Sequence, residues 1–341
     1  MQSVALPRKD PKSAQALWQK MLGQLVQQKL DAEAIPLALV KLSIFTLLLA
    51  AALSLAWFAT AFWVLLVASF SLALIVAQFA FLGHDAGHGA LSRQGWINET
   101  FGQLSMTVVT GLAFDEWYGR HRTHHQFCQY EPKDPDMAVD LVVSLTADSR
   151  EKKTALGRLF TRCQGMSVWF LSLFFAHSQR HLSQYGVLRE PRKYWRDLLV
   201  LVLHFALWWG LPLFLLHISW SRVLIVYLLP LFILGPYLAA IFWVNHVGMP
   251  LIKDLDSFSF LEHQVVTSRT IINPPGMDWF FGGLNFQIEH HLYPQVPSFR
   301  LRRLQAIVQK DLEAEHISYH GVSFGAAVRH IAGHFRCIAK G

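Results

Sequence analysis

Residues 42–82 read LSIFTLLLAAALSLAWFATAFWVLLVASFSLALIVAQFAFL and contain no charged side chain. A membrane-spanning helix needs about twenty apolar residues, so this run is long enough for two spans. We place the turn between them near residues 54–60. Residues 198–216 and 223–244 form a second apolar pair, joined by the short connector 217–222. The sequence therefore predicts an all-α integral membrane protein with four transmembrane helices in two hairpins.

The overall composition agrees with this interpretation. Only 16% of the 341 residues are charged, against about 25% in an average soluble protein. No basic run interleaved with aromatic residues indicates a nucleic-acid partner. Cys128, Cys163 and Cys337 form no CxxC pair, which fits a reducing cytoplasm and argues against an iron–sulfur or zinc-thiolate site.

The basic residues predict the orientation in the membrane. Six Lys and Arg residues lie in 1–41, fourteen in 83–196 and nine in 247–341, whereas the 217–222 connector contains only Arg222. The N-terminus also lacks the features of a cleaved signal peptide. We therefore expect a multi-pass protein with both termini in the cytoplasm, in a bacterial inner membrane or, if the source is eukaryotic, in the endoplasmic reticulum.

Five segments follow along the chain. We expect an amphipathic cytosolic or interfacial helix in 1–35, the first transmembrane hairpin in 36–83, a cytosolic loop in 84–195, the second hairpin in 196–245 and a cytosolic tail in 246–341. The apolar stripe of the first helix either lies on the membrane or packs on the protein's own cytosolic cap. Residues 299–315 predict a final amphipathic helix, with Leu301, Leu304, Ile307, Val308 and Leu312 facing inward.

Three histidine clusters flank the apolar segments: HDAGH at 84–88, HRTHH at 121–125 and QIEHH at 287–291. The second and third share the spacing i, i+3, i+4, which places side chains on one face of a helix. The predicted topology brings all three clusters to the cytosolic side, together with His246 at the end of the fourth span. The eight histidines are His84, His88, His121, His124, His125, His246, His290 and His291.

Imidazole binds iron, zinc, copper and nickel well, and eight imidazoles exceed the needs of one metal ion. The pattern therefore predicts two metals side by side, and the alternative is three coincidental surface clusters. For the remaining histidines we expect no ligand role. We expect His177 and His181 to have packing or interfacial roles. His204 and His217 lie toward the other side of the membrane. The tail histidines at 316, 320, 330 and 334 are expected in surface or disordered positions.

These motifs carry a family resemblance. HDAGH, then WYGRHRTHH with DPD downstream, then NFQIEHHLYPQVP, resemble the three histidine boxes of the integral-membrane fatty acid desaturases over roughly residues 36–320. The resemblance implies four spans with a helical cytosolic cap that carries a non-haem di-iron site. Because zinc competes well for imidazole, recombinant protein can carry zinc in place of iron.

The resemblance implies a ligand set. One iron would bind His84, His125, His246 and His290, and the other would bind His88, His121, His124, His291 and Gln287. Gln287 stands where many family members have histidine, and it resembles the subgroup that inserts a double bond on the carboxyl side of an existing one. Its amide either contacts a metal, directly or through water, or only hydrogen-bonds a ligand.

Carboxylate and amide side chains are expected around the ligands. Asp85 and Glu289 would orient imidazole N–H groups, whereas Asp134 and Asp136 either do the same or form a turn. Asn245 and Asn285 would hydrogen-bond ligands or a bound water.

A second departure from the glutamine-type members concerns electrons. Those members often carry a fused cytochrome b5 domain with an HPGG haem motif, which this sequence lacks. We therefore expect a separate electron carrier, of ferredoxin or cytochrome b5 type, with its reductase. The expected reaction is the O2-dependent desaturation of a fatty acyl chain linked to a lipid, to CoA or to a carrier protein, within membrane lipid.

Three other readings stay open at this point. A di-iron hydroxylase, ketolase or acetylenase would share the scaffold. A membrane zinc hydrolase would need only three ligands and an activated water. A metal transporter or sensor would place polar ligands inside its spans, and these spans are nearly free of them.

Overall fold

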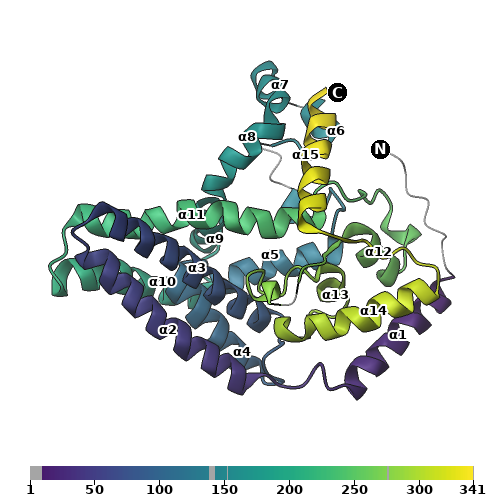
Figure 1. Ribbon diagram of the computed structural model, residues 1–341, viewed down its shortest axis with the longest axis horizontal. Coiled ribbons are helices and arrows are strands. Elements are labelled where there is room, and N and C mark those ends of the chain that lie inside the picture. The colour runs from purple at the N-terminus through teal and green to yellow at the C-terminus, as the bar shows by residue number, and fades with distance from the viewer. Residues whose placement is uncertain (1–9, 138–142, 152, 275, 341) are drawn as a thin grey trace. The chain divides into compact units, whose positions relative to one another are not determined.

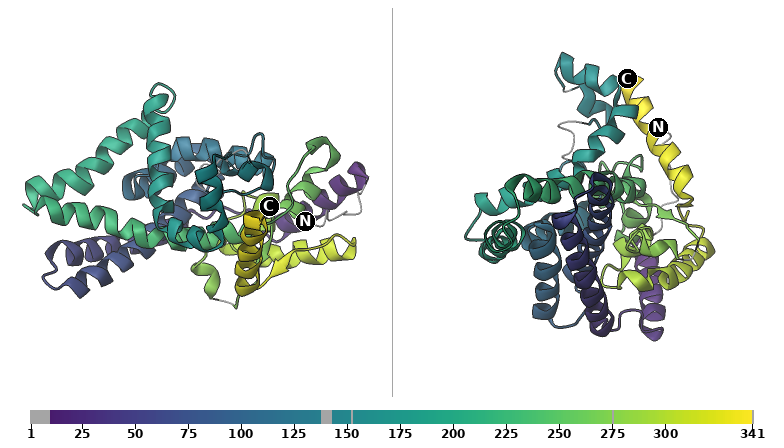
Figure 2. Two further views of the ribbon diagram at one scale, coloured as in Figure 1. Left: turned by 90° about the horizontal axis from the view of Figure 1, so that it is seen from above. Right: turned by 60° about the vertical axis from the view of Figure 1, so that its left-hand side comes forward.

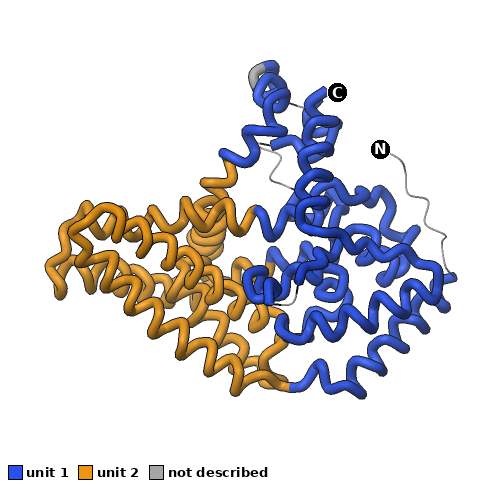
Figure 3. The backbone as a smooth tube through the Cα atoms, in the orientation of Figure 1, with its two compact units in different colours: residues 1–32, 120–170, 240–341 blue, residues 33–119, 171–239 orange. Residues whose placement is uncertain are grey.

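The structure is a computed structural model that describes residues 10–340 except 138–142, 152 and 275. The chain divides into two compact units, coloured in Figure 3. Unit 1 contains residues 1–32, 120–170 and 240–341, and unit 2 contains residues 33–119 and 171–239. Two helices, α5 (Phe114–Phe127) and α11 (Trp220–His246), begin in unit 2 and end in unit 1.

Unit 2 contains the long apolar helices. They are α2 (Ile35–Phe58), α3 (Phe62–Gly87), α10 (Trp195–Phe205), which continues as the π-helix η4 (Ala206–Leu215), and most of α11. All four segments are long and apolar enough to cross a membrane, which confirms the prediction of four spans. The shorter elements of this unit are α4 (Gly95–Gly102), η1 (Gln103–Thr110), η3 (Ser172–Phe174) and α9 (Phe175–Arg189).

Helices α2 and α3 form a hairpin, as Figures 1 and 2 show. Small residues such as Ala52, Ala56 and Ala68 are buried between them beside Phe45 and Phe79, so the two backbones approach closely. Helix α3 continues to Gly87, so His84 lies inside its last turn rather than beyond it as expected. Helix α3 thus ends later than hydropathy alone indicates, because its hydrogen bonding continues through most of the polar HDAGH segment.

Unit 1 is built from shorter helices. They are α1 (Pro11–Gln27), α6 (Ala147–Glu151), α7 (Ala155–Arg162), α8 (Gln164–Leu171), η5 (Leu255–Ser257), α12 (Phe260–Thr267), η6 (Met277–Trp279), α13 (Gln287–Leu292), η7 (Ser298–Arg300), α14 (Leu301–Ala314) and α15 (Phe324–Lys340). Two short strands, β1 (Thr270–Ile271) and β2 (Gly321–Val322), pair in parallel with Thr270 opposite Gly321.

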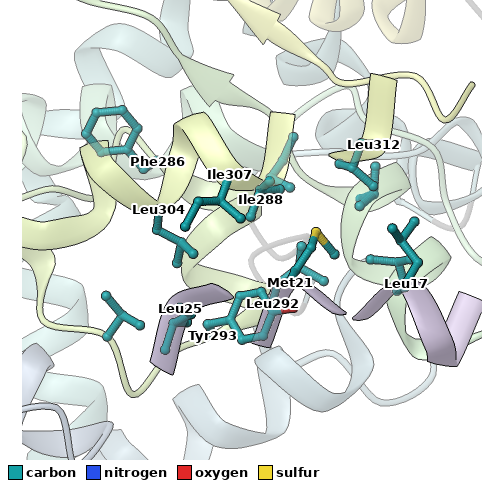
Figure 4. Packing of buried hydrophobic residues seen from close by; sticks show 14 of the residues in the cluster. Leu17, Met21, Leu25, Phe286, Ile288, Leu292, Tyr293, Leu304, Ile307 and Leu312 are labelled. Atoms are coloured by element: carbon teal, nitrogen blue, oxygen red, sulfur yellow. The ribbon is translucent and has the colours of Figure 1, made fainter. Parts of the chain in front are cut away.

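Helix α1 packs on α14 and α12, and Figure 4 shows part of the shared core. Its buried stripe of Ala14, Leu17, Met21 and Leu25 meets Leu304 and Leu312 among others, and α1 runs beside α14 in Figures 1 and 2. Lys20 and Gln24 bind the carboxylate of Asp311 at 3.0 and 2.6 Å. Of the two alternatives for the first helix, the structure therefore supports packing on the protein itself.

The tail differs from expectation in one respect. Helix α14 buries the five predicted side chains, but it is not the final helix. Helix α15 follows and buries Ala327, Ile331, Phe335 and Ile338 at a helical spacing, against Val168 and Ile271. Of the two alternatives for the tail histidines, surface or disordered positions, His330 and His334 lie on this ordered helix, and His330 is exposed.

Candidate metal centre

Three elements of unit 1 carry six of the eight histidines. Helix α5 supplies His121, His124 and His125, because offsets of three and four residues share a helix face. The short helix α13 supplies His290 and His291, and the last residue of α11 is His246. Each of these helices has its own hydrogen-bonded backbone, so each ligand pair is held rigidly.

The imidazole rings form two adjacent groups. In the first group, the Nε2 atoms of His121 and His290 lie 3.2 and 3.1 Å from Nε2 of His125. In the second group, the ring centroids of His124, His246 and His291 lie 4.9 to 5.3 Å apart. The rings of His125 and His291 stack with their centroids 4.1 Å apart, so the two groups are in contact.

This grouping differs from the expected division of ligands between the metals. His246 was assigned with His125 and His290, but it lies with His124 and His291. His121 was assigned with His124 and His291, but it lies beside His125. The reason is rotation along α5: the consecutive residues His124 and His125 are turned by about 100° from each other, so His125 faces His290 whereas His124 faces the end of α11.

A fixed acceptor holds the Nδ1 atom of each imidazole in the second group. Nδ1 of His124 lies 2.9 Å from Oδ1 of Asp134, and Nδ1 of His291 lies 2.8 Å from Oε1 of Gln264. Nδ1 of His246 lies 3.0 Å from the carbonyl oxygen of Thr267. Because these oxygens accept hydrogen bonds, each Nδ1 carries the proton, and each Nε2 has the lone pair that binds metals.

Asp134 both forms a turn and hydrogen-bonds an imidazole, the two alternatives that the sequence left open. Its Oδ1 accepts from His124 and from the backbone N–H of Asp136, and its Oδ2 accepts from the backbone N–H of Gln129 at 2.8 Å. Asp134 is buried, whereas Asp136 is exposed and lies 3.5 Å from His124. The turn therefore positions one carboxylate against a candidate ligand.

Gln287 lies among these groups with both ends of its amide bonded. Its Nε2 donates to Nε2 of His246 at 3.0 Å, and its Oε1 accepts from Asn245 at 2.9 Å. Asn245 also donates to the carbonyl oxygen of Leu284 at 3.0 Å. Asn245 therefore holds the Gln287 amide in place, and its expected role beside a metal ligand stays a prediction.

Glu289 and Asn285 have other partners. The Glu289 carboxylate accepts from Thr270 and Tyr319, both at 2.7 Å, and burial raises its pKa to about 7. Asn285 donates to the carbonyl oxygen of Ile271 and to Asp278. Both side chains therefore tie α13 to the neighbouring strand and loops.

Sequence analysis missed Cys128 and Gln264. The buried thiol of Cys128 lies 3.4 Å from Nδ1 of His246, next to the candidate ligands. Burial opposes its ionisation, but His246 and His124 lower its pKa to about 6. Cys128 was detectable, because it stands four residues after His124 and directly follows the last residue of α5, whereas nothing in the sequence around Gln264 marks it.

Electrostatics at His124 follow from the same neighbours. Burial disfavours the imidazolium, but Asp136, Cys128 and Asp134 together raise the pKa of His124 well above its ordinary value. A histidine surrounded by anionic groups attracts cations in general, including a metal ion that would displace the proton.

In unit 2, α3 carries the HDAGH segment. The rings of His84 and His88 lie 4.8 Å apart, Trp117 packs 5.7 Å from His84, and Asp85 is buried on the same helix. The ligand roles of His84 and His88, and the orienting role of Asp85, stay predictions.

The other histidines bond or pack elsewhere. His177 packs against Phe232 at 4.3 Å, as expected of a packing residue. His204 hydrogen-bonds Tyr227, and His334 donates to the carbonyl oxygen of Leu145 from α15.

Comparison with known proteins places the chain in a family. The family model described as fatty acid desaturase matches residues 60–323. A mouse protein, fatty acid desaturase 2-like protein FADS2B, is 30% identical over 261 residues, covering 76% of this chain and 53% of its own length. Two Borago officinalis proteins are also similar. A Delta(8)-fatty-acid desaturase is 25% identical, and the match covers 77% of this chain and 61% of the relative. An acyl-lipid (9-3)-desaturase is 29% identical, and the match covers 73% of this chain and 58% of the relative. This chain thus spans about half to three fifths of the length of these relatives. Together with its four apolar helices and histidine-rich groups, the match over most of the chain shows that this membrane protein belongs to the fatty acid desaturase family.

Proposed function

We propose that this chain uses O2 and two iron ions to introduce a double bond into a fatty acyl chain. One observation carries the proposal: His124, His246 and His291 each have Nδ1 held by an oxygen acceptor, which leaves Nε2 as the metal-binding atom. Carboxylate- or carbonyl-anchored imidazoles of this kind are typical of transition-metal sites.

The donor set fits a pair of transition metals. His124, His246 and His291 would hold one ion, with Gln287 beside them, and His121, His125 and His290 would contribute to the other. The sequence assigns His84 and His88 to the same centre. Nitrogen donors of this number suit iron, and they also explain how zinc would compete during overexpression.

When bound, two irons supply an oxidant strong enough to remove hydrogen from an unactivated methylene, which no side chain can do. The protein supplies position and environment. Asp134, Gln264 and Thr267 hold the imidazole protons away from the metal side, and the buried surroundings of His124, His290 and His291 exclude bulk water.

The substrate is proposed only as an acyl chain linked to a lipid, to CoA or to a carrier protein. The similar proteins are named for different double-bond positions, Delta(8) and (9-3), so no position is transferred to this chain. Gln287 is the residue that relates the chain to desaturases acting on the carboxyl side of an existing double bond.

The direct test is lipid analysis of a host that expresses the full chain. Mass spectrometry with double-bond localisation should detect a new unsaturated acyl species, absent when His124 is replaced by Ala. His181→Ala is the matched control, because this side chain is exposed, hydrogen-bonds Gln184 and stacks on His177 rather than on any candidate ligand. A hydroxylated or acetylenic product would assign the chain to one of the alternative reactions, and an unchanged lipid profile with normal expression would contradict the proposal.

Metal analysis tests the cofactor independently. Purified protein from iron-supplemented cells should contain two irons per chain, and His124→Ala and His291→Ala should each lose metal. One ion per chain, or one zinc with hydrolytic activity, would favour the membrane hydrolase instead.

We also propose a separate electron carrier. Reduction of O2 to water takes four electrons, and removal of two hydrogens from the substrate supplies two of them. A ferredoxin or cytochrome b5 with its reductase would supply the others, and an acidic carrier would be attracted to the net charge of +7. Turnover with NADPH and O2 should require both added proteins and should fall as salt rises. Turnover with NADPH alone would refute this part.

A further inference from the structure

The outward face of helices α7 and α8 in unit 1 is apolar. Leu159 and Phe160 of α7 and Met166 and Phe170 of α8 are all exposed, Phe160 by 65% and Met166 by 84%. Single apolar side chains are common on protein surfaces, whereas larger groups of them mark a surface that contacts something other than water. These four lie within twelve residues of chain, so they form such a group.

The inward face of the same segment is polar. Helix α15 runs beside α7, as Figure 1 shows, and the buried side chains of this region include Thr161 and Gln164. Oγ1 of Thr161 lies 3.3 Å from Oγ of Ser144. The Gln164 amide accepts from the backbone N–H of Ser144 at 3.0 Å and donates to its carbonyl oxygen at 3.2 Å. The segment thus presents hydrogen-bonding groups to the interior and apolar groups to the exterior.

A helix that contacts water has the opposite arrangement, with its apolar stripe on the protein core and its polar face outside. Rotation of α7 to bury Leu159 and Phe160 would break the hydrogen bonds of Thr161 and would bring its hydroxyl out of the interior. The buried partner Ser144 would then lose its own acceptor or donor, which is unfavourable. The folded protein therefore holds the apolar face outward.

The charge of the segment is positive. Residues 153–171 contain Lys153, Arg158 and Arg162 and no acidic residue. Arg158 and Arg162 are exposed, and no carboxylate of the described part of the chain forms an ion pair with either. An arginine can lay its apolar stem along such a face and keep its guanidinium at a polar boundary. Apolar side chains with neighbouring cations complement the interfacial layer of an anionic lipid bilayer.

Chain continuity also favours lipid as the partner. Helix α8 ends at Leu171, the residue at which the chain re-enters unit 2, and α9 and the span beginning at Trp195 follow. The segment is therefore tethered to the bilayer whenever the protein is inserted. A protein partner in solution loses translational and rotational freedom at each encounter, whereas a tethered segment that contacts lipid does not.

We propose that Leu159, Phe160, Met166 and Phe170 insert into the interfacial layer of a bilayer that contains anionic lipid, with Arg158 and Arg162 beside the lipid phosphates. Interfacial helices insert about 5–10 Å, so the four side chains lie at the boundary between headgroups and acyl chains rather than in the centre of the bilayer.

Fluorescence of the full chain in lipid nanodiscs tests the depth. Replacing the exposed Cys163 and Cys337 by Ser leaves only the buried Cys128, so Phe160→Cys then accepts one nitrobenzoxadiazole label. In discs of phosphatidylcholine with phosphatidylglycerol, this label should emit at a shorter wavelength than the same label at Glu313→Cys, an exposed position of α14. A doxyl group at carbon 5 of the lipid chain should quench it more than one at carbon 12. Met166→Cys should behave in the same way, and it replaces Phe160→Cys if that variant does not fold.

The double variant Arg158→Gln with Arg162→Gln tests the preference for anionic lipid. Each basic residue near an anionic surface contributes about 1 kcal/mol, or about fivefold in partitioning. The double variant should therefore lower the ratio of lipid-inserted to water-exposed label by about 25-fold in discs with phosphatidylglycerol, and much less in discs of phosphatidylcholine alone. Arg189→Gln, an exposed arginine outside the segment, should keep the ratio of the unsubstituted protein.

Several results would overturn the proposal. Labels at both positions that neither doxyl lipid quenches would show that the face does not reach lipid. A short emission wavelength without lipid quenching would show that protein covers it, such as a second copy of the chain, and a wavelength shift that requires an added electron carrier would assign the face to that carrier. Equal quenching with and without phosphatidylglycerol would refute the role of the arginines. None of these readouts depends on metal or on desaturation, so their failure leaves the proposed function intact.

Discussion

Asp134→Asn is the most informative single change at the candidate metal centre. The carboxylate accepts from His124 at 2.9 Å on one oxygen and from the backbone of Gln129 at 2.8 Å on the other. An amide of the same shape has only one accepting oxygen, so its NH2 group must face one of these two donors. At least one hydrogen bond to a buried charged group is therefore lost, and the other becomes neutral.

The magnitude follows from those contacts. A hydrogen bond to a charged group contributes about 1.5–3 kcal/mol, which corresponds to about 10- to 150-fold in an equilibrium constant. Removing a partner that orients a metal-binding histidine typically costs about 10- to 100-fold in metal affinity or activity. We therefore expect Asp134→Asn to lose metal at about 10- to 100-fold lower chelator concentration than the unsubstituted protein, with a comparable fall in turnover.

The assay is a chelator titration of the purified protein, followed by elemental analysis and acyl product formation. Asp136→Asn is the matched control, because its carboxylate is 59% exposed and lies 3.5 Å from His124. Circular dichroism should show both variants folded. If folded Asp134→Asn retains metal and turnover within twofold of the unsubstituted protein, the orienting role of Asp134 is wrong.

Three other predictions follow from the same structure. Replacing His88, His124 or His291 by Ala should abolish turnover with the protein still membrane-inserted, whereas His330→Ala should leave most of it; full activity of a folded His124→Ala variant would contradict the ligand set. Gln287→His removes the amide that bridges Asn245 and His246, so metal content or rate should change substantially, and elemental analysis with unchanged values would place Gln287 away from the metals. Burial, with Asp197 and Glu99, raises the pKa of Asp115 to about 6, so the folded protein retains a proton that the unfolded chain loses near pH 4. Stability should therefore fall as the pH rises from about 4 through 6, and Asp115→Asn should flatten this slope in thermal unfolding scans; an unchanged slope would show that Asp115 does not cause it.

Local signals in the sequence were sufficient for the helices that cross the membrane. The charge-free run of residues 42–82 predicts two spans because lipid admits only backbones whose hydrogen bonds are internally satisfied. The stripe at Leu301, Leu304 and Leu312 likewise predicts a packed helix, and the structure confirms both. Helix α15 was missed although its stripe of Ala327, Ile331, Phe335 and Ile338 is equally regular.

The histidine types and spacings were readable in the sequence, since offsets of three and four residues fix which side chains share a helix face. Which of those helix faces meet in the folded protein could not be predicted from the sequence. His246 joins His124 and His291 across 122 and 45 residues of chain, and Gln264 orients His291 from a helix with no recognisable motif. Likewise, Arg180 meets Tyr227 and Gly111 only after three segments fold together. Residue chemistry and helical period are local properties that the sequence alone determines, whereas the hydrogen-bond partner of each imidazole and the solvation of each charge depend on long-range packing, which only the tertiary structure decides.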